Sequence, residues 1–530
     1  MSRQNFIRAT GLVVLLALLL QVGLFAGGLY RLTSDESARI LTAWHMTWAN
    51  ALEPFLWPPF YKLFVGGAMK LFPSIFFTPR VLVCLAGLLA LLAIGRLAYA
   101  LFQDRLVSLV AMVLGLLAPQ RLLFSVVPLS DIYYFLFITA AAAFVVEWLR
   151  SGRTGRLYLG CLCVLLAETV RFESGLFAAF IELLLLHRLA IRRTLPIGAF
   201  LVASVILFIF PPLWALDSLV WYGSLKNLNV AAQQFIGEFG HNLAYAIKWS
   251  PLRFFIQDMI WNPLTIAGIG ALLLLSRRDT VVRDWGLVFA VPLIVFSVYT
   301  TATFSIPTAA TWRTSGVWSL MILPFDAYVA VRIGHWLAGR AHLPRAALAG
   351  LLLLAILPMG VRSLWYMDDG LHNNETGRLH QERALDVMLN SRLAALPGAR
   401  ALIDSSTNLD YMDVLAFSRF PDRLILTGDA DPVLIGFYEP MQQAYADKPG
   451  ISGMLRDHFG LAHGGDARAL AARDVRFIVV RNPAFVSALQ ANPRMVTLGH
   501  VNDWTLFSVG RVGNMTGAAA RPLVTAAHAG

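Results

Sequence analysis

The chain has 530 residues, of which 57% are hydrophobic and only 14% are charged, and its mean hydropathy is +0.63. These values exclude a soluble globular protein, because too few polar side chains remain to cover the surface of a chain of this length. The net charge of +11 does not indicate nucleic-acid binding here, because most basic residues fall in short gaps between apolar runs, as in membrane proteins. The three cysteines lie inside apolar runs, which excludes a disulfide framework and a cysteine metal site.

Each membrane-spanning helix needs roughly 20 mostly apolar residues, and this template predicts about eleven spans. They are expected near 9–30, 80–101, 106–124, 131–149, 157–170, 174–190, 195–216, 260–276, 285–304, 315–333 and 345–364. The fifth and sixth are separated only by Arg171-Phe172-Glu173, so their fusion would lower the number by one. The first span has a basic start but is longer than the core of a secretory signal and lacks a clear cleavage site. The predicted fold class is mainly α, a polytopic helical membrane domain.

Every second gap between the expected spans is basic, beginning with Arg3 and Arg8 before the first span. The others contain Arg96 and Arg105; Arg150, Arg153 and Arg156; Arg188, Arg192 and Arg193; Arg277, Arg278 and Arg283; and Arg332, Arg340 and Arg345. Positive gaps mark the cytoplasmic side, so the N-terminus is expected inside. An odd number of spans then places the C-terminus outside, and one span fewer would place it inside.

The composition changes near residue 365, where the long apolar runs end. Short strand-like pieces follow at 401–404, 423–426, 475–480 and 504–509, and helix-like pieces lie near 378–395 and 465–473. This alternation predicts a soluble α/β domain. We expect a membrane domain at 1–364 with a first outer loop at 31–79, an α/β domain outside the membrane at 365–512, and a disordered tail at 513–530.

Two acids, Asp35 and Glu36, come shortly after the first span, at its expected outer end. Ser34 is a typical N-cap, so a helix is expected to begin at Asp35. Pro58 and Pro59 are suited to open a second helix with an apolar face. Because these helices are expected at the outer membrane surface, the pattern favours a catalytic site at that surface over a simple anchor.

These segments resemble glycosyltransferases of fold type C, in the branch of the protein O-mannosyltransferases and the lipid A aminoarabinose transferases. The resemblance is carried by Asp35-Glu36-Ser37-Ala38-Arg39, by the Pro-Pro-Phe-Tyr segment at 58–61, by Arg171-Phe172-Glu173-Ser174-Gly175, and more weakly by Arg313 followed by Pro324. It implies an integral-membrane enzyme that transfers a sugar from a polyprenyl phosphate to an acceptor on the non-cytoplasmic face. The chain departs from the aminoarabinose branch at Leu56-Trp57, where those enzymes carry an acid and a lysine.

An inverting transfer of this kind requires a carboxylate to take the proton of the acceptor hydroxyl, and Asp35 is the expected base. Glu36 is expected to share this role, to bind the acceptor or to stabilise the helix. The leaving phosphate requires cations, for which Lys62, Arg171 and Arg313 are the candidates, with Glu173 beside Arg171. No metal or other cofactor is expected, although Asp35, Glu36 and Asp131 suit a divalent ion if the donor is a diphosphate.

Purely structural roles fit some of these residues as well. Arg171 and Glu173 are also consistent with an ion pair that closes an outer turn, and Lys62 with a side chain that reaches the interface from an apolar helix. The alternative function is a transporter or flippase of a lipid-linked glycan, although no internal repeat or matched pair of broken helices is seen. The composition suggests a bacterial inner membrane with a periplasmic C-terminal domain; the acceptor is a lipid, glycan or protein.

Overall fold

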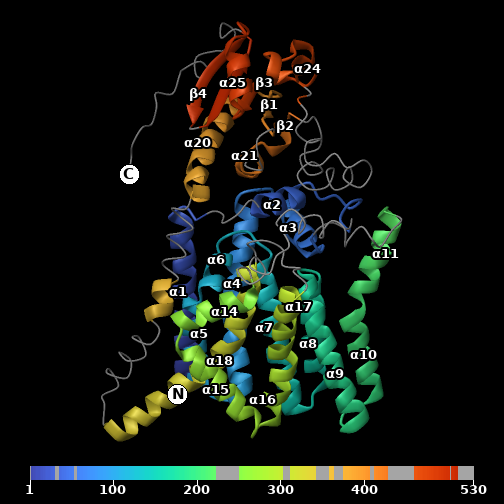
Figure 1. The fold of residues 1–530 in the computed structure, drawn as a ribbon, viewed down its shortest axis with the longest axis vertical. Coiled ribbons are helices and arrows are strands. Elements are labelled where there is room, and N and C mark those ends of the chain that lie inside the picture. Colours follow the sequence, from blue (N-terminus) through green and yellow to red (C-terminus); the bar gives the residue numbers. More distant parts are fainter. Residues whose placement is uncertain are drawn as a thin grey trace. The chain divides into compact units, whose positions relative to one another are not determined.

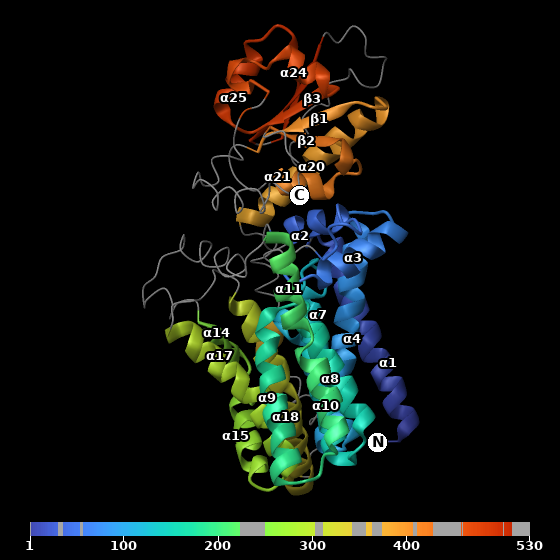
Figure 2. The ribbon, with the colours of Figure 1, turned by 90° about the vertical axis from the view of Figure 1, so that its right-hand side faces the viewer.

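A computed structural model gives the fold of the protein (Figures 1 and 2). It describes residues 2–29, 35–52, 57–222, 250–302, 311–341, 357–362, 374–405, 411–427, 457, 459–501 and 503–510. The chain forms two compact units. The first, the membrane unit, contains residues 1–29, 48–61 and 80–369; the second, the C-terminal unit, contains 30–47, 62–79 and 370–530. Two segments of the predicted first outer loop therefore group with the C-terminal residues.

The membrane unit is a bundle of apolar helices, several of which run side by side in Figures 1 and 2. Its elements are α1 (Arg3–Ala26), α4 (Phe77–Phe102), α5 (Arg105–Leu117), α6 (Pro119–Phe124), α7 (Asp131–Ser151), α8 (Thr154–Glu168), η1 (Phe172–Ser174), α9 (Gly175–Leu186), η2 (His187–Ile191), α10 (Ile197–Phe208), α11 (Phe210–Tyr222), α14 (Pro251–Trp261), α15 (Leu264–Ser276), α16 (Thr280–Trp285), η3 (Gly286–Ala290), α17 (Val291–Ala302) and α18 (Thr311–Ala341). Helix α7 packs along α8, and α15 packs along α18.

Seven described helical segments are long and apolar enough to cross a membrane. A further pair, α14 and α15, is together also long and apolar enough but is bent by 110°. Described helices occupy ten of the eleven expected spans, and the predicted mainly α membrane fold is confirmed. The expected eleventh span at 345–364 lies largely outside the described residues, so the total number of spans stays a prediction.

The C-terminal end of α7 lies next to the basic segments that connect the expected spans. Arg150 donates to the carbonyl oxygen of Ala100 at the end of α4 (2.7 Å) and to Asp279 before α16 (3.1 Å). Asp279 also caps α16 by accepting from the Val281 amide. Because a helix rises 1.5 Å per residue, Asp131 and Arg150 at the two ends of α7 are about 30 Å apart, the thickness of a hydrocarbon core. The basic gaps and Asp131 thus lie at opposite ends of the bundle.

The C-terminal unit contains a five-stranded sheet in the order β2-β1-β3-β5-β4. Its strands are β1 (Arg400–Ile403), β2 (Leu424–Leu426), β3 (Val475–Val480), β4 (Met495–Val501) and β5 (Trp504–Val509), and its helices include α2 (Asp35–Trp44), α3 from Lys62 onward (Phe60–Leu71 in full), α20 (Asn374–Ala395), α21 (Tyr411–Phe417), α24 (Ala467–Ala472) and α25 (Pro483–Gln490). β1 is parallel to β2 and β3, whereas β5 is antiparallel to β3 and β4. The α/β character predicted for this part of the chain is confirmed.

The four strands predicted from sequence match β1, β2, β3 and β5 closely, because each is a short apolar run that is buried in the sheet. β4 was not predicted, since it is a half-exposed edge strand that contains Gly499 and His500 and shows no continuous apolar run. α25 begins at Pro483 after the N-cap Asn482, a start signal that the sequence analysis did not use. The tail at 513–530 lies outside the described residues.

Candidate active site

The buried carboxylate of Asp131, the first residue of α7, lies between two arginines of the membrane unit. Its Oδ1 accepts a hydrogen bond from Arg171 Nη1 at 2.7 Å, and its Oδ2 accepts one from Arg313 Nη2 at 2.5 Å. The Asp131 side chain is completely buried, and those of Arg171 and Arg313 are 15% and 4% exposed. Three helix starts, at α7, η1 and α18, therefore bring one acid and two guanidinium groups together.

Arg171 also binds Glu173 two residues further along the chain. Its Nη2 donates to Glu173 Oε1 at 2.7 Å and its Nε to Oε2 at 3.3 Å. Burial alone would lower the pKa of Arg171, but the carboxylates of Glu173 and Asp131 outweigh it and raise this pKa, so the guanidinium stays charged. Three of its five N–H groups are used in these bonds, and the other two have no hydrogen-bond partner among the described residues. The site therefore contains the Arg171–Glu173 ion pair that a purely structural role predicts, and it also offers N–H donors to a further anion.

The Pro-Pro-Phe-Tyr segment docks against the same end of the membrane unit. The Phe60 amide donates to the Thr169 carbonyl oxygen at 2.9 Å, and the Tyr61 hydroxyl donates to the Pro128 carbonyl oxygen at 2.8 Å. The Phe60 ring lies 5.2 Å from that of Tyr133 in α7. Thr169 and Pro128 closely precede Arg171 and Asp131. Two separate segments of the sequence resemblance, around 60 and around 171, are thus neighbours in space.

Gly316 allows α18 to approach α7 one turn after Arg313. A Cβ atom at Gly316 would lie 2.6 Å from Phe135 Cζ and 3.0 Å from Gln120 Cβ, closer than real Cβ contacts allow. The glycine therefore sets the distance between the helices that carry Arg313 and Asp131. Gly316 could not be recognised from the sequence, because nothing local marks the partner that approaches it.

The remaining predicted residues belong to the two loop segments of the C-terminal unit. A helix, α2, begins at Asp35 as predicted, but the Asp35 side chain lies outside the described residues. Glu36 is completely buried. Its neighbour Ser37 donates to Asp413 of α21 at 2.5 Å, which fastens α2 to the C-terminal helices. Lys62 is half-buried in α3, and its phosphate role stays a prediction, as does the role of Asp35 as base.

Two buried acids of the membrane unit are additional candidates. Glu168, at the end of α8, is 2% exposed, and neither carboxylate oxygen has a hydrogen-bond partner among the described residues. Asp258 accepts from Gln120 and Ser319 at 2.7 Å each and pairs with Arg362 at 2.7 Å. Neither Asp258 nor Glu168 is assigned a functional role from the sequence. An acid inside an apolar run is itself a functional signal, and this signal would have marked Glu168.

An apolar cavity of about 380 Å³ lies in the membrane unit along α18. Trp318, Met321 and Ile322 of α18 line it, together with residues of α14 to α17 such as Leu272. Met321 follows Arg313 by eight residues, or about 12 Å along the helix. One helix therefore carries a guanidinium group near its start and the wall of an apolar cavity further along. Among the described side chains, no group of three or more His, Cys, Asp or Glu is arranged to hold a metal ion.

Comparison of the whole chain with known structures decides the fold. ArnT from Cupriavidus metallidurans in the apo state superposes with a TM-score of 0.61 and 14% identity over 94% of this chain and 98% of its own. ArnT bound to undecaprenyl phosphate gives 0.62 and 14% over 97% and 100%. The apo oligosaccharyltransferase of Archaeoglobus fulgidus gives 0.53 and 13% over 91% and 70%. This chain has the fold of the type C glycosyltransferases.

The resemblance read from the sequence is thereby confirmed at the level of fold. No protein-family model matches this chain, and no curated protein sequence matches it. The identity of 13–14% explains this result, because the fold is retained while few residues are shared. The match to ArnT covers both the membrane helices and the C-terminal α/β part. The protein is an integral membrane protein of this architecture.

Proposed function

We propose that this protein is an integral-membrane glycosyltransferase that moves a sugar from a polyprenyl-phosphate donor to an acceptor at the outer membrane surface. The observation that carries the proposal is the match to ArnT over nearly the full length of both chains. ArnT has been crystallised with undecaprenyl phosphate, a polyprenyl phosphate of the class expected here. The orientation, with a bacterial inner membrane and a periplasmic C-terminal domain, belongs to the same proposal.

The arginines around Asp131 supply the electrostatic support for this donor. As the sugar leaves, negative charge grows on the phosphate, and guanidinium groups held beforehand in place stabilise it without reorganisation. Arg171 keeps spare N–H donors, and Arg313 is held by the same carboxylate. The planar fork of arginine suits phosphate oxygens better than the point charge of a lysine. Asp131 and Glu173 orient the two guanidinium groups for this task.

The apolar cavity along α18 fits the other half of a lipid donor. A polyprenyl chain has no polar atoms, and its burial against side chains such as Trp318 and Met321 is favourable in proportion to the apolar area covered. The spacing along α18 would place the phosphate near Arg313 and the first prenyl units about two turns further along the helix. The same helix would thus hold both chemical parts of the donor.

In the proposed reaction the acceptor hydroxyl attacks the anomeric carbon while the bond to the phosphate oxygen breaks, which inverts the configuration. Asp35 takes the proton of the hydroxyl as general base, and the phosphate leaves as an anion beside Arg171 and Arg313. Glu36 supports α2 from its buried position, and Lys62 supplies a further cation at the surface. The reaction is proposed to need no metal ion, because the leaving group is a monophosphate that arginines can neutralise.

The alternative function is a transporter or flippase for a lipid-linked glycan, and one observation favours it. The 110° bend between α14 and α15 is a broken helix of the kind that transporters use at their binding sites. Transporters built from repeats carry such a break twice, at corresponding positions, whereas the described ranges contain one such bent pair. The single break is better explained as a re-entrant segment that helps to line the donor site.

The deciding experiment measures transfer of radiolabelled sugar from polyprenyl-phosphate donors by the purified full-length protein in detergent. Asp35→Asn should lower turnover by about 10²–10⁴-fold, the usual contribution of a general base. Asp503→Asn, at an exposed acid distant in sequence from the site, serves as the control and should keep wild-type turnover. Equal turnover in the Asp35 variant would remove Asp35 as base. Absence of turnover with every donor, together with donor movement between the leaflets of vesicles, would establish the transport function instead.

A further inference from the structure

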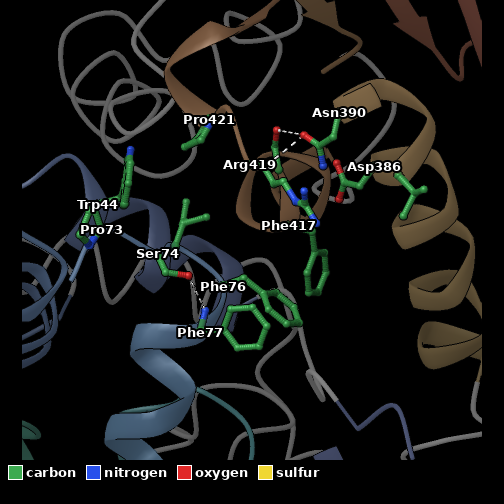
Figure 3. Close-up of a pocket in the computed structure, with 13 residues that line it drawn as sticks. Trp44, Pro73, Ser74, Phe76, Phe77, Asp386, Asn390, Phe417, Arg419 and Pro421 are labelled. Atoms are coloured by element: carbon green, nitrogen blue, oxygen red, sulfur yellow. Dashed lines mark hydrogen bonds between the residues drawn. The ribbon is translucent and has the colours of Figure 1, made fainter. Parts of the chain in front are cut away.

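A second cavity, of about 430 Å³, lies within the C-terminal unit and takes no part in the site around Asp131. Its walls come from α2, from the 73–77 turn before α4, from α20 and from the end of α21 and the residues that follow it (Figure 3). Two parts of the first outer loop and two helices of the C-terminal domain thus enclose one space. Its volume falls in the range of roughly 300–1,000 Å³ that is typical of small-molecule sites.

Among the residues that line this cavity, Asp386 in α20 has an unusual environment for an acid. Its side chain is 2% exposed, and neither carboxylate oxygen has a hydrogen-bond partner among the described residues, yet Asp386 lines the cavity (Figure 3). Burial raises the pKa of Asp386 well above its usual range, and the nearby carboxylate of Asp413 adds to this effect. A buried polar group without a partner costs free energy. Its presence at this position is therefore better explained by a ligand than by stability.

Four aromatic side chains line the same cavity, those of Trp44, Phe76, Phe77 and Phe417. The Trp44 indole is held in place because its Nε1 donates to Asp422 at 3.0 Å. The Phe76 and Phe417 rings lie 5.5 Å apart and are tilted by 53° to each other. Figure 3 shows Trp44 on one side and the two phenylalanines below the acid. These flat apolar surfaces are fixed before a ligand binds.

Asn390, one helical turn from Asp386, adds a directed polar group. Its side-chain oxygen accepts from the Arg419 amide and from Ser418 Oγ, each at 3.0 Å (Figure 3). Both bonds use the oxygen, and the amide NH₂ has no hydrogen-bond partner among the described residues, so it can donate to a ligand. Arg419 itself is exposed, and among the described residues that line this cavity it is the one with a positive charge. The cavity therefore combines a carboxyl group, an amide and aromatic faces.

We propose that this cavity binds one sugar ring of the acceptor, and hence that the acceptor is a saccharide or a glycolipid. A pyranose has an apolar face of C–H groups that suits an aromatic ring, and hydroxyl groups that both donate and accept hydrogen bonds. Asp386 can bond such hydroxyls in either protonation state, and the Asn390 NH₂ can donate to another. The acceptor role rests on the proposed glycosyltransferase function, whereas sugar binding by the cavity does not.

Charged ligands fit this cavity less well. A phosphate would have to approach the carboxyl of Asp386 with only Arg419 to balance it, and the charge of Arg419 would disfavour an ammonium group. Each mismatch costs free energy in a partly buried site. A neutral ring satisfies Asp386 without adding a net charge.

The test is saturation-transfer NMR on the full-length protein in lipid nanodiscs, without donor. The probes are methyl α-mannoside, methyl β-glucoside and ethanolamine. We expect at least one glycoside to bind the wild type, and Asp386→Leu and Trp44→Ala each to weaken its binding about tenfold, the loss of a hydrogen bond or a stacking contact. Asp503→Leu, at an exposed acid that does not line the cavity, should bind as the wild type does.

Binding that is unchanged in both cavity variants, or absent for both glycosides in the wild type, would overturn the proposal. Binding of ethanolamine alone would overturn it as well, because the cavity would then recognise a cation. Circular dichroism of each variant separates lost binding from lost folding. Because no donor is present, sugar binding and donor turnover fail independently, so a failure of this inference and a failure of the proposed function can be told apart.

Discussion

Asp131 and Arg313 are 182 positions apart in the sequence, but Asp131 Oδ2 lies 2.5 Å from Arg313 Nη2 in the interior of the membrane unit. Asp131 starts α7, and Arg313 lies in the first turn of α18. Both side chains are almost completely buried, so each would be costly without the other. The second oxygen of Asp131 holds Arg171 in the same way, and one carboxylate thus fixes both arginines that are proposed to bind the donor phosphate.

Asp131→Asn should destabilise the protein by about 3–5 kcal/mol, because it removes the negative charge that two buried guanidinium groups share. Arg313→Gln alone should also be destabilising, and the double variant should lose less than the sum of the two. The measurement is a double-mutant cycle of unfolding in denaturing detergent, where groups in contact couple by about 0.5–3 kcal/mol. Strictly additive losses would show that the pair does not interact as described.

Arg313→Lys keeps the charge but loses the planar fork, so donor binding should weaken while the fold is retained. The measurement is the affinity for a polyprenyl phosphate that lacks the sugar. Arg96→Lys, which changes an arginine that pairs with Glu147, is the matched control and should leave this affinity unaltered. Equal affinities in the wild type and the Arg313 variant would assign Arg313 a structural role only.

Gly316→Ala should destabilise the protein by about 1–3 kcal/mol, because the new methyl group would lie 2.6 Å from the Phe135 ring and would force the helices apart. Donor affinity should fall with it, since Arg313 lies one turn away. Gly334→Ala is the control in the same helix, because a Cβ there meets nothing within 4 Å. This second variant should be neutral or slightly stabilising. Identical melting temperatures for the two variants would contradict the close approach.

Gly268→Ala should disturb the bend between α14 and α15. A Cβ atom at Gly268 would lie 2.1 Å from Asp326 Oδ1, whose other oxygen accepts from Asn262 at 2.9 Å and from Thr265 at 3.0 Å, both next to the bend. Displacing Asp326 would break these two bonds, at about 0.5–1.5 kcal/mol each. Gly270→Ala in the same helix has open space and should melt like the wild type; a common loss in both variants would argue for helix propensity instead.

Asp386→Asn should stabilise the protein relative to the wild type, and this gain should grow as the pH rises. Because the pKa of Asp386 is raised in the folded chain, the folded state keeps a proton that the unfolded state has already lost above about pH 4. Wild-type stability therefore falls from about pH 4 up to the raised pKa, and the asparagine variant escapes this loss. The measurement is the unfolding free energy of both proteins across this range, with the exposed Val387→Asn as control. A difference independent of pH would contradict the buried, unpartnered acid.

The sequence by itself determined the elements whose cause is local. Apolar runs of sufficient length predicted the membrane helices, because a segment in lipid must satisfy its own backbone hydrogen bonds. Pro58 and Pro59 predicted the start of α3, and the buried strands β1, β2, β3 and β5 were visible as short apolar runs. The residues around 35, 60 and 171 also indicated the glycosyltransferase fold that the comparison with ArnT confirms.

Only the tertiary structure decided which of these residues meet. No local pattern shows that Arg171 and Arg313 share Asp131, that Gly316 must lack a side chain because Phe135 lies against it, or that Asp386 lines the same cavity as Trp44 and Phe417. These contacts join segments that are far apart in the chain, and packing of the whole bundle and of the whole C-terminal unit determines them. The length of a helix is determined by its own sequence. Burial of a side chain depends on which distant segments pack against it, and the local sequence does not specify those segments.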